Sequence, residues 1–188
     1  MIVKENYPIE NSLNLKSQAK YFIELSEETD FNELSLFLKK YELPVLILGE
    51  GTNLVPPIFF DGIILKPLFP SIKLSLDNTL ISAGASVNWH SFVTFCIKNN
   101  INGFENLSLI PGSVGASPIQ NIGAYGADVS NLIESVDCYD FVLNKLLKLT
   151  AAECDFSYRH SGLKKSSLIV MKINFYANLP VELNLDYK

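Results

Sequence analysis

The sequence predicts an α+β fold in which β-sheet dominates the second half of the chain. Two patterns support this prediction. A strand, a helix and a second strand follow one another in residues 20–48, and three strand-like runs fill most of residues 133–176. The chain has 188 residues, of which 48% are hydrophobic, so it can bury a core as one domain or as two small lobes.

The first part of the chain places one helix between two strands. Residues 20–25, KYFIEL, read as a strand. Asp30 is followed three positions later by Glu33, the spacing of a capping box, which predicts a helix from there to about Lys40. The apolar run VLIL at 45–48 then predicts a short buried strand that ends at the first glycine of the chain.

The rest of the chain combines tight turns with one amphipathic helix. Apolar residues recur at i, i+3, i+4 and i+7 from Trp89, which predicts a helix that ends near Asn99 and Asn100. The remaining apolar runs read as strands. They are residues 62–66, 71–76, 79–83, 133–140, 146–150 and 168–176, with a turn at Asp77 and Asn78 between the second and the third.

Charge and composition narrow the class of partner. The net charge is -5 and the isoelectric point is about 5.0, and basic residues never occur in runs longer than a pair. Because nucleic-acid binding needs a basic footprint, we expect no nucleic acid and instead a small-molecule ligand.

The N-terminus and the cysteines indicate a cytoplasmic protein. The opening segment MIVKENYPIEN lacks the apolar core of a signal peptide, and no run approaches the roughly 18 apolar residues that span a bilayer. Cys96, Cys138 and Cys154 lie too far apart to suggest a disulfide framework or a zinc site. We therefore expect no membrane partner, no metal and a reducing compartment.

The first glycine-rich loop runs from Gly49 to Leu54. Its glycines let the backbone come close to a ligand, and Thr52 and Asn53 add side-chain donors, so the loop has the chemistry of a phosphate cradle. It matches neither the dinucleotide fingerprint, which needs a third glycine where Leu54 stands, nor the P-loop. An ordinary turn after a strand is the alternative.

A second and longer glycine-rich segment spans residues 103–126. Small residues cluster at 112–117 and leave room for a flat or diphosphate-bearing ligand against the backbone. Gln120 and Asn121 add amide groups for hydrogen bonds. Loops of this length inside a compact domain are functional or disordered, and the apolar residues here argue against disorder, so we expect a binding site.

Three motifs, in order, resemble one enzyme family. The segment GFENLSLIPGSVGASPIQNIGAYG at 103–126 resembles the FAD-binding signature of the UDP-N-acetylenolpyruvoylglucosamine reductase family. LILGEGTNLV upstream and CDFSYRHS downstream match further motifs of that family, and Asn11 opens a segment similar to its Asn-Thr-Phe start. The resemblance covers nearly the whole chain. It implies a p-cresol-methylhydroxylase-type FAD-binding fold of two subdomains, a small one at residues 1–68 and a larger one at 69–188.

The resemblance also implies roles for individual residues. FAD would lie between the two subdomains, with the two glycine-rich segments around it. The residues around the diphosphate would be Gly49, Gly51, Thr52, Asn53, Pro111, Gly112, Ser113, Gly115 and Ala116, and those along the flavin ring would be Ile119, Gln120, Asn121 and Gly123. Tyr125 would stand on the substrate side of the pocket, and Arg159 would be the active-site arginine.

The implied reaction gives Arg159 a chemical task. NADPH reduces FAD, and the flavin then passes hydride to the enolpyruvyl double bond of a nucleotide-sugar, UDP-N-acetylglucosamine enolpyruvate. The product, UDP-N-acetylmuramate, serves peptidoglycan synthesis, and through it the cell wall, cell shape and cell division. Hydride addition leaves enolate-like charge that a fixed guanidinium stabilises. Arg159 is the sole arginine of the chain, and a structural ion pair or an exposed charge is the alternative for it.

Structural roles are predicted for other side chains. We expect His90, beside Trp89 on the predicted helix, to be a packing histidine rather than a catalytic base. Tyr158 is expected to be a packing aromatic, which is also the alternative for Tyr125. His160 departs from the resemblance, because the family has aspartate at this place.

The resemblance leaves part of the enzyme without a counterpart. Family members continue into a substrate-binding domain that supplies a serine proton donor and a distal glutamate, and neither can be assigned in this chain. A truncated enzyme, a split enzyme completed by a second polypeptide, and a non-catalytic FAD-binding module are the alternatives, and an oxidase of the same fold is another. Exposed apolar surface where the missing domain would pack favours a fragment or a split enzyme over a module.

Overall fold

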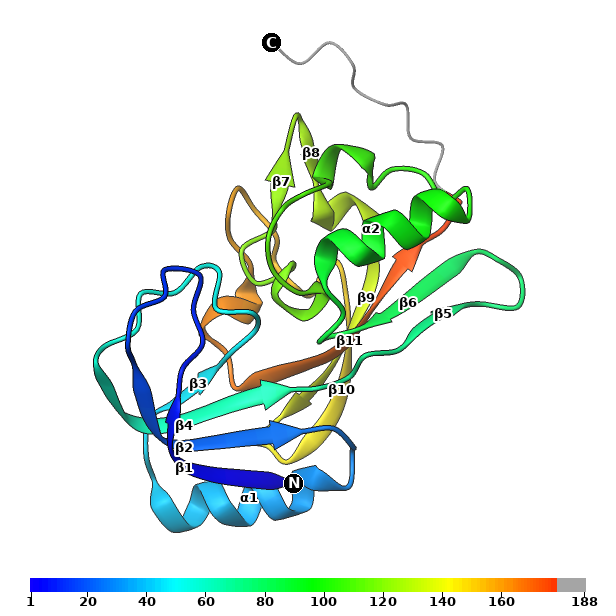
Figure 1. The fold of residues 1–188 in the computed structure, drawn as a ribbon. Helices are drawn as coiled ribbons and strands as arrows, with labels where there is room; N and C mark the ends of the chain where they lie inside the picture. The colour runs from blue at the N-terminus through cyan, green and yellow to red at the C-terminus, as the bar shows by residue number, and fades with distance from the viewer. Residues whose placement is uncertain (179–188) are drawn as a thin grey trace.

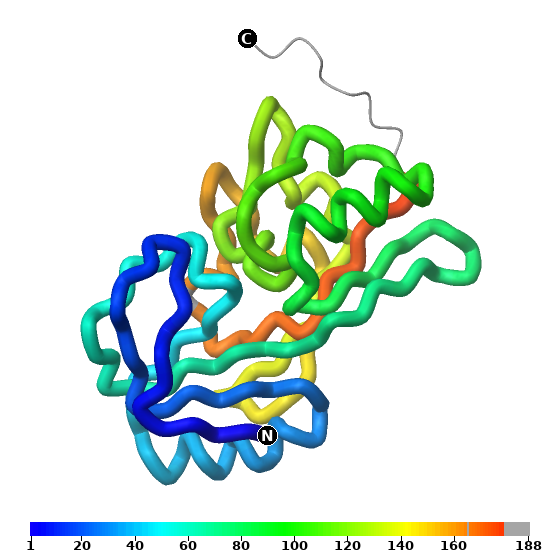
Figure 2. The backbone as a smooth tube through the Cα atoms, in the orientation of Figure 1, coloured from blue at the N-terminus to red at the C-terminus, as the bar shows by residue number. Residues whose placement is uncertain are grey.

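The computed structural model describes residues 1–178 and confirms the α+β class. Two main sheets adjoin each other: helix α1 lies under the first in the view of Figure 1, and helix α2 and several irregular loops lie over the second. The backbone trace in Figure 2 shows these loops reaching back toward the first sheet. The irregular segments therefore lie where the two sheets meet.

The first sheet has four strands in the order β1-β2-β4-β3. β1 is antiparallel to β2, whereas β2 and β3 are both parallel to β4. The bounds are β1 (Ile2–Pro8), β2 (Gln18–Leu25), β3 (Val45–Ile47) and β4 (Phe59–Pro67). The three predicted strands in this region are confirmed. β1 was not predicted, because it is a mostly exposed edge strand without a buried apolar pattern.

Helix α1 (Asp30–Tyr41) confirms the predicted helix, but the predicted capping box is wrong. Asp30 is the first helical residue, and the N-cap is Thr29, whose side chain makes no capping hydrogen bond. The Asp30 carboxylate instead accepts hydrogen bonds from the backbone N–H groups of Ser26 and Glu27 and from the Met1 ammonium. Asp30 therefore stabilises the loop before the helix and the start of the chain.

The second sheet has five strands in the order β10-β9-β11-β6-β5, each antiparallel to its neighbours. All five correspond to predicted strands. Their bounds are β5 (Ile72–Leu74), β6 (Leu80–Gly84), β9 (Ile133–Asp140), β10 (Lys145–Thr150) and β11 (Leu168–Tyr176). A small separate hairpin consists of β7 (Gly123–Ala124) and β8 (Ala127–Asp128).

Helix α2 (Trp89–Lys98) confirms the predicted amphipathic helix. Its four apolar positions at helical spacing are all buried, and the Asn88 side chain caps the helix by accepting a 3.0 Å hydrogen bond from the Ser91 N–H. Four 3₁₀ helices lie in the loops, at Glu105–Leu107, Val114–Ala116, Val129–Leu132 and Gly162–Lys165.

Strand β11 belongs to both main hydrophobic cores. Ile169 and Met171 pack with α1 and the first sheet, whereas Ile173 and Phe175 pack under α2. The predicted subdomain boundary after residue 68 falls in the connection between β4 and β5. That the parts before and after this boundary form separate subdomains stays a prediction. Within residues 1–178 no helix is long and apolar enough to cross a membrane, and no group of three or more potential metal ligands occurs.

Candidate functional site

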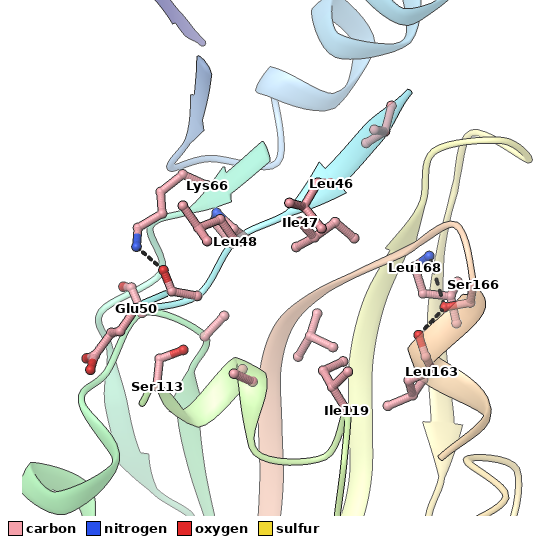
Figure 3. A pocket seen from close by; sticks show the side chains of 18 of the residues that line it. Leu46, Ile47, Leu48, Glu50, Lys66, Ser113, Ile119, Leu163, Ser166 and Leu168 are labelled. Atoms are coloured by element: carbon pink, nitrogen blue, oxygen red, sulfur yellow. Dashed lines mark hydrogen bonds between the residues drawn. The ribbon is translucent and has the colours of Figure 1, made fainter. Parts of the chain in front are cut away.

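A cleft made of two adjoining cavities separates the end of β3 from the loop at residues 111–122. The larger cavity has a volume of about 480 Å³ and the smaller about 240 Å³. Both are lined by residues 46–50 on one side and by Ser113, Ala116 and Ile119 on the other. Figure 3 shows these two walls facing each other. The two glycine-rich segments of the sequence therefore contribute to the same cleft.

The first glycine-rich loop packs against the N-terminal segment. Gly51 has a φ angle of 67°, and a Cβ atom at this position would lie 2.2 Å from the carbonyl oxygen of Glu10. Ser12 donates its backbone N–H to the Gly51 carbonyl at 3.1 Å, and Asn11 closes the segment by hydrogen bonds to Leu15. Position 51 therefore accepts only glycine, because both the backbone conformation and the contact with Glu10 exclude a side chain.

The second glycine-rich segment packs closely on the connection between β6 and α2. A Cβ atom at Gly115 would lie 2.5 Å from the Cβ of Ala85, and the Gly115 N–H donates to the Ala85 carbonyl at 3.0 Å. The Val114 N–H donates to the Val87 carbonyl at 2.8 Å. Gly112 adopts a φ angle of 127°. The small residues of this segment thus let two backbones approach each other and fix the wall of the cleft.

The two loops meet at one edge of the cleft. A Cβ atom at Gly49 would lie 3.1 Å from the Ser113 hydroxyl and 3.2 Å from the Ala116 methyl group. The Asn53 side-chain amide donates a 2.7 Å hydrogen bond to the side-chain oxygen of Gln120. Each loop therefore helps to position the other.

Among residues 1–178, three formally charged side chains line the cleft: Glu50, Lys66 and Lys164. Lys66 comes from β4, is half-buried, and donates from Nζ to the carbonyl of Gly49, as Figure 3 shows. Burial lowers the pKa of Lys66 below its ordinary value, although neighbouring carboxylates oppose this shift. Glu50 accepts a 3.2 Å hydrogen bond from the side-chain amide of Asn88.

Most of the predicted binding residues line this cleft. They come from both loops, and the first and the last of them, Gly49 and Gln120, are 71 positions apart in the sequence. The lining residues among them are Gly49, Gly51, Thr52, Asn53, Pro111, Gly112, Ser113, Gly115, Ala116, Ile119 and Gln120. The structure therefore brings them together as neighbours, while their roles toward a ligand stay predictions.

Four predicted residues lie outside the lining of both cavities: Asn121, Gly123, Tyr125 and Arg159. The Arg159 guanidinium donates to the backbone carbonyls of Asn121 and Gly123. Arg159 also has a φ angle of 53°, in the left-handed region that non-glycine residues rarely adopt. In this structure Arg159 stabilises the segment after the cleft wall and does not enter either cavity.

The Asn121 side chain holds neighbouring loops together by hydrogen bonds. Asn121 is buried, its side-chain oxygen accepts a 3.1 Å hydrogen bond from the Ser130 N–H, and its amide donates at 3.1 Å to the Ser157 carbonyl. Asn121 therefore connects the cleft wall to the turn that carries Arg159.

Tyr125 lies at the tip of the small β7–β8 hairpin. Tyr125 and Gly126 have φ angles of 51° and 76°, which give a two-residue turn of the type that fits β-hairpins, and Tyr125 is 58% exposed. Tyr125 is therefore a turn residue with a largely exposed side chain.

Two predicted packing roles are wrong. Tyr158 is 85% exposed, because it stands at the tip of a turn between Ser157 and His160 rather than against the core. His90 lies on the exposed face of α2, where its Nδ1 accepts a 3.3 Å hydrogen bond from the backbone N–H of Leu109. Trp89 takes the buried position next to it.

Several residues of the larger cavity were not predicted. They come from β4, from the connection between β6 and α2, from the segment before β11 and from the start of β11 itself. They include Lys66, Ala85, Ser86, Leu163, Lys164, Ser166, Leu168 and Val170. Lys66 alone had a signal in the sequence, since it is a charged residue directly after the apolar run GIIL. The others could be found only from the packing of distant segments.

The three cysteines are free and buried, and they do not line the cleft. Burial raises the pKa of Cys96 and of Cys138 to about 12, so both thiols are poor nucleophiles at neutral pH.

Comparison with known proteins gives three consistent results. Residues 19–145 match a protein-family model described as FAD binding domain. The chain is similar to the UDP-N-acetylenolpyruvoylglucosamine reductase of Bordetella pertussis (strain Tohama I), with 36% identity over 183 residues that cover 94% of this chain and 52% of that protein. It is also similar to the protein of that name from Shewanella sp. (strain ANA-3), with 38% identity over 158 residues, 83% of this chain and 46% of that protein. The chain spans about half the length of these curated relatives.

Solved structures agree in fold. The UDP-N-acetylenolpyruvylglucosamine reductase from Thermus caldophilus superimposes with a TM-score of 0.65 and 22% identity, over 85% of this chain and 55% of that one. A solvent-stable cholesterol oxidase gives a TM-score of 0.69 at 12% identity, over 94% of this chain and 38% of that one. With the family match, these similarities confirm the p-cresol-methylhydroxylase-type FAD-binding fold.

Proposed function

The chain belongs to the FAD binding domain family, and from this premise we propose that it holds FAD in the cleft between its two glycine-rich loops. The observation that carries the proposal is the meeting of these loops, through Gly49 against Ser113 and through the Asn53–Gln120 hydrogen bond, at two adjoining cavities. Extended dinucleotides bind in elongated, mostly apolar clefts with a few fixed polar groups, and the lining has this character.

The chemistry of the lining fits the cofactor. Gly51 and Gly112 have positive φ angles, a backbone conformation in which successive N–H groups can converge on a diphosphate. Thr52, Asn53 and Gln120 add neutral polar groups around the same cavity. Leu46, Leu48 and Ile119 supply apolar surface for flat rings, and they lie on facing walls in Figure 3.

We further propose that the chain serves the NADPH-dependent reduction of UDP-N-acetylglucosamine enolpyruvate to UDP-N-acetylmuramate, in the cytoplasm, as a step of peptidoglycan precursor synthesis. The support is the similarity to reductases of that name over 94% and 83% of this chain. Bound FAD supplies hydride transfer between NADPH and the enolpyruvyl double bond. This proposal makes the protein a contributor to cell wall formation, and so to cell shape and division.

In this reaction we assign Arg159 to the stabilisation of charge on the substrate and Tyr125 to the substrate side of the site. Arg159 is held beside residues 121–123 by its hydrogen bonds to two carbonyls, next to the segment that we assign to the flavin ring. A guanidinium kept at such a place stabilises negative charge that develops beside a carboxylate. The serine proton donor and the distal glutamate that the family resemblance implies cannot be assigned in this chain, and we propose that another segment or a second polypeptide contributes them.

A non-catalytic FAD-binding module is the second candidate. Tyr125 is 58% exposed and Tyr158 is 85% exposed, and the Arg159 guanidinium lies 5.6 Å from the centre of the Tyr158 ring. Exposed aromatic surface beside an arginine is typical of a face that a substrate or another protein part covers. This observation favours the catalytic role over the module.

A spectroscopic titration tests the proposal. The purified chain should show a flavin absorption spectrum, or gain one with added FAD, and NADPH should bleach it under anaerobic conditions. With the enolpyruvyl substrate, no recovery of colour is expected for the chain alone, and recovery is expected once the contributing polypeptide is added. Free FAD with NADPH and no protein is the control. A chain that stays colourless with excess FAD contradicts the whole proposal, whereas FAD binding without any response to NADPH supports the module.

A further inference from the structure

Lys66 is a cation of the cleft that forms no ion pair with any carboxylate in residues 1–178. It belongs to β4 and lines the edge of the larger cavity, with Nζ on the Gly49 carbonyl at the start of the first glycine-rich loop (Figure 3). Within residues 1–178, the six ion pairs all involve other cations. Three carboxylates, Glu10, Glu50 and Glu24, lie near enough to favour the charged form of Lys66. Glu24 is paired with Lys4 at 2.5 Å and Glu50 accepts a hydrogen bond from Asn88, and none of the three forms an ion pair with Lys66.

Burying the Lys66 ammonium group costs free energy unless an anion pairs with it. A half-buried ammonium loses part of its hydration, and a backbone carbonyl replaces only some of what water provided. Bringing a diphosphate to this place adds more negative charge, and the glycine-rich loops contain no positive side chain between residues 49 and 54 or between 111 and 122. Glu50 in the same lining adds a negative charge, which makes the binding of an anion there still less favourable.

We propose that Lys66 is a further cofactor-binding residue, whose ammonium group leaves or shares the Gly49 carbonyl to pair with the diphosphate of FAD. This inference rests on the proposed function, because it concerns FAD in the same cleft. It assigns the charge neutralisation to a strand residue outside both loops, while the loops supply neutral backbone donors. Lys164, the other basic residue of the lining, directly follows Leu163 in the chain, and Figure 3 shows Leu163 and Ser166 on the opposite side of the larger cavity from Lys66.

A purely structural role for Lys66 is the competing explanation. In that case Lys66 would serve only to hold the Gly49 carbonyl and so shape the loop. The two roles differ in their response to salt, because an ion pair with a bound anion is screened by salt, whereas a loss of loop shape weakens binding equally at all salt concentrations.

The test compares FAD affinity over a range of salt concentrations, measured by the quenching of flavin fluorescence. The variants are Lys66→Met, Lys66→Arg and, as a matched control, Lys73→Met, since Lys73 is an exposed strand lysine of β5 outside both cavities. At low salt we expect Lys66→Met to weaken FAD binding by roughly 10- to 100-fold, the usual scale for a charge-assisted hydrogen bond. Its affinity should approach that of the unmodified chain as salt rises. Lys66→Arg should retain most of the affinity, and Lys73→Met should match the unmodified chain.

Two outcomes overturn the inference. One is a Lys66→Met variant that binds FAD as tightly as the unmodified chain. The other is a loss of affinity that is the same at all salt concentrations and that Lys66→Arg does not restore, which would assign Lys66 to loop structure only. Thermal unfolding of each variant checks that the fold is retained. Failure of the unmodified chain to bind FAD contradicts the proposed function itself, and so is distinguishable from failure at Lys66.

Discussion

The side-chain amide of Asn53 donates a 2.7 Å hydrogen bond to the side-chain oxygen of Gln120, 67 positions later in the chain. This contact joins the two glycine-rich loops at the smaller cavity, which both residues line. Both loops must keep their mutual position for one ligand to touch them at the same time. The hydrogen bond therefore links the geometry of one loop to that of the other.

Loss of the Asn53–Gln120 hydrogen bond should weaken FAD binding with little effect on stability. We expect Asn53→Ala and Gln120→Ala each to raise the Kd for FAD by about 3- to 10-fold, since a partly exposed hydrogen bond contributes about 0.5–1.5 kcal/mol. The double variant should cost less than the sum of the two, because both changes remove the same contact. Fluorescence titration of the four proteins measures this coupling. Strict additivity would show that the two side chains act independently.

Position 51 should not tolerate a side chain. Gly51→Ala places a Cβ atom 2.2 Å from the Glu10 carbonyl at a φ angle of 67°, so we expect a loss of about 2–4 kcal/mol in the free energy of unfolding. Gly162→Ala is the matched control, because the nearest atom to its Cβ would lie 3.4 Å away. That variant should remain within about 0.5 kcal/mol of the unmodified chain in urea unfolding. Equal effects at the two positions would contradict the explanation.

Tyr125 should be replaceable by asparagine with a gain in stability. Its φ angle of 51° is unfavourable for tyrosine, whereas asparagine adopts this region readily, so Tyr125→Asn should stabilise the chain by about 0.5–1 kcal/mol. Tyr158→Asn is the control at a more exposed turn position without a positive φ angle, and it should give no such gain. Thermal unfolding distinguishes the two. A less stable Tyr125→Asn variant would mean that the tyrosine ring has contacts worth more than the backbone strain.

Asp140 should make stability depend on acid pH. Burial raises the pKa of Asp140, but hydrogen bonds from Leu143, Ser167 and Val142 outweigh it and hold the pKa below its ordinary value of 3.8. The unfolded chain therefore takes up the proton first, so this contribution is complete above about pH 5 and decreases as the pH falls through and below 4.

The Asp140→Asn variant checks this dependence. It should lose about 1–3 kcal/mol at pH 7, and the difference from the unmodified chain should shrink toward pH 3. Urea unfolding at pH 7, 5, 4 and 3 gives the profile, and a difference that stays constant over this range would contradict the assigned cause.

The contact between Phe31 and Tyr139 should couple the two parts of the fold. Their rings stack at 4.0 Å with an angle of 5°, and the Tyr139 hydroxyl donates to the Phe31 carbonyl at 3.2 Å. Tyr139→Ala should cost about 3–5 kcal/mol, as large-to-small changes in a core do, whereas Tyr139→Phe keeps the stacking and should cost about 1–2 kcal/mol. If residues 1–68 and 69–178 form separate subdomains, Tyr139→Ala should also split the unfolding transition that fluorescence and circular dichroism report. A single steep transition for Tyr139→Ala would argue for one cooperative unit.

Most strands and both helices could be predicted from sequence because their signals are local. Trp89, Phe92 and Cys96 recur at helical spacing, and the run at 168–176 is long and apolar, so each pattern is complete within about ten residues. The glycine-rich loops were predicted for the same reason. The fold family was implied by the resemblance of three such motifs, in their order along the chain, to a known enzyme family.

The sequence by itself determined most of the segments that fold as helix or strand, and it predicted which loops meet at the cleft. Only the tertiary structure decided how side chains are used: Asp30 binds the preceding loop instead of capping its helix, Tyr158 is exposed, and Arg159 contacts backbone carbonyls just after the cleft wall. The physical reason is that local patterns depend on neighbouring residues in the chain, whereas burial, hydrogen-bond partners and cavity lining depend on segments that meet only after folding. Lys66 shows this difference, because its surroundings, the Gly49 carbonyl 17 positions away and the cavity that it lines, form only when the chain folds.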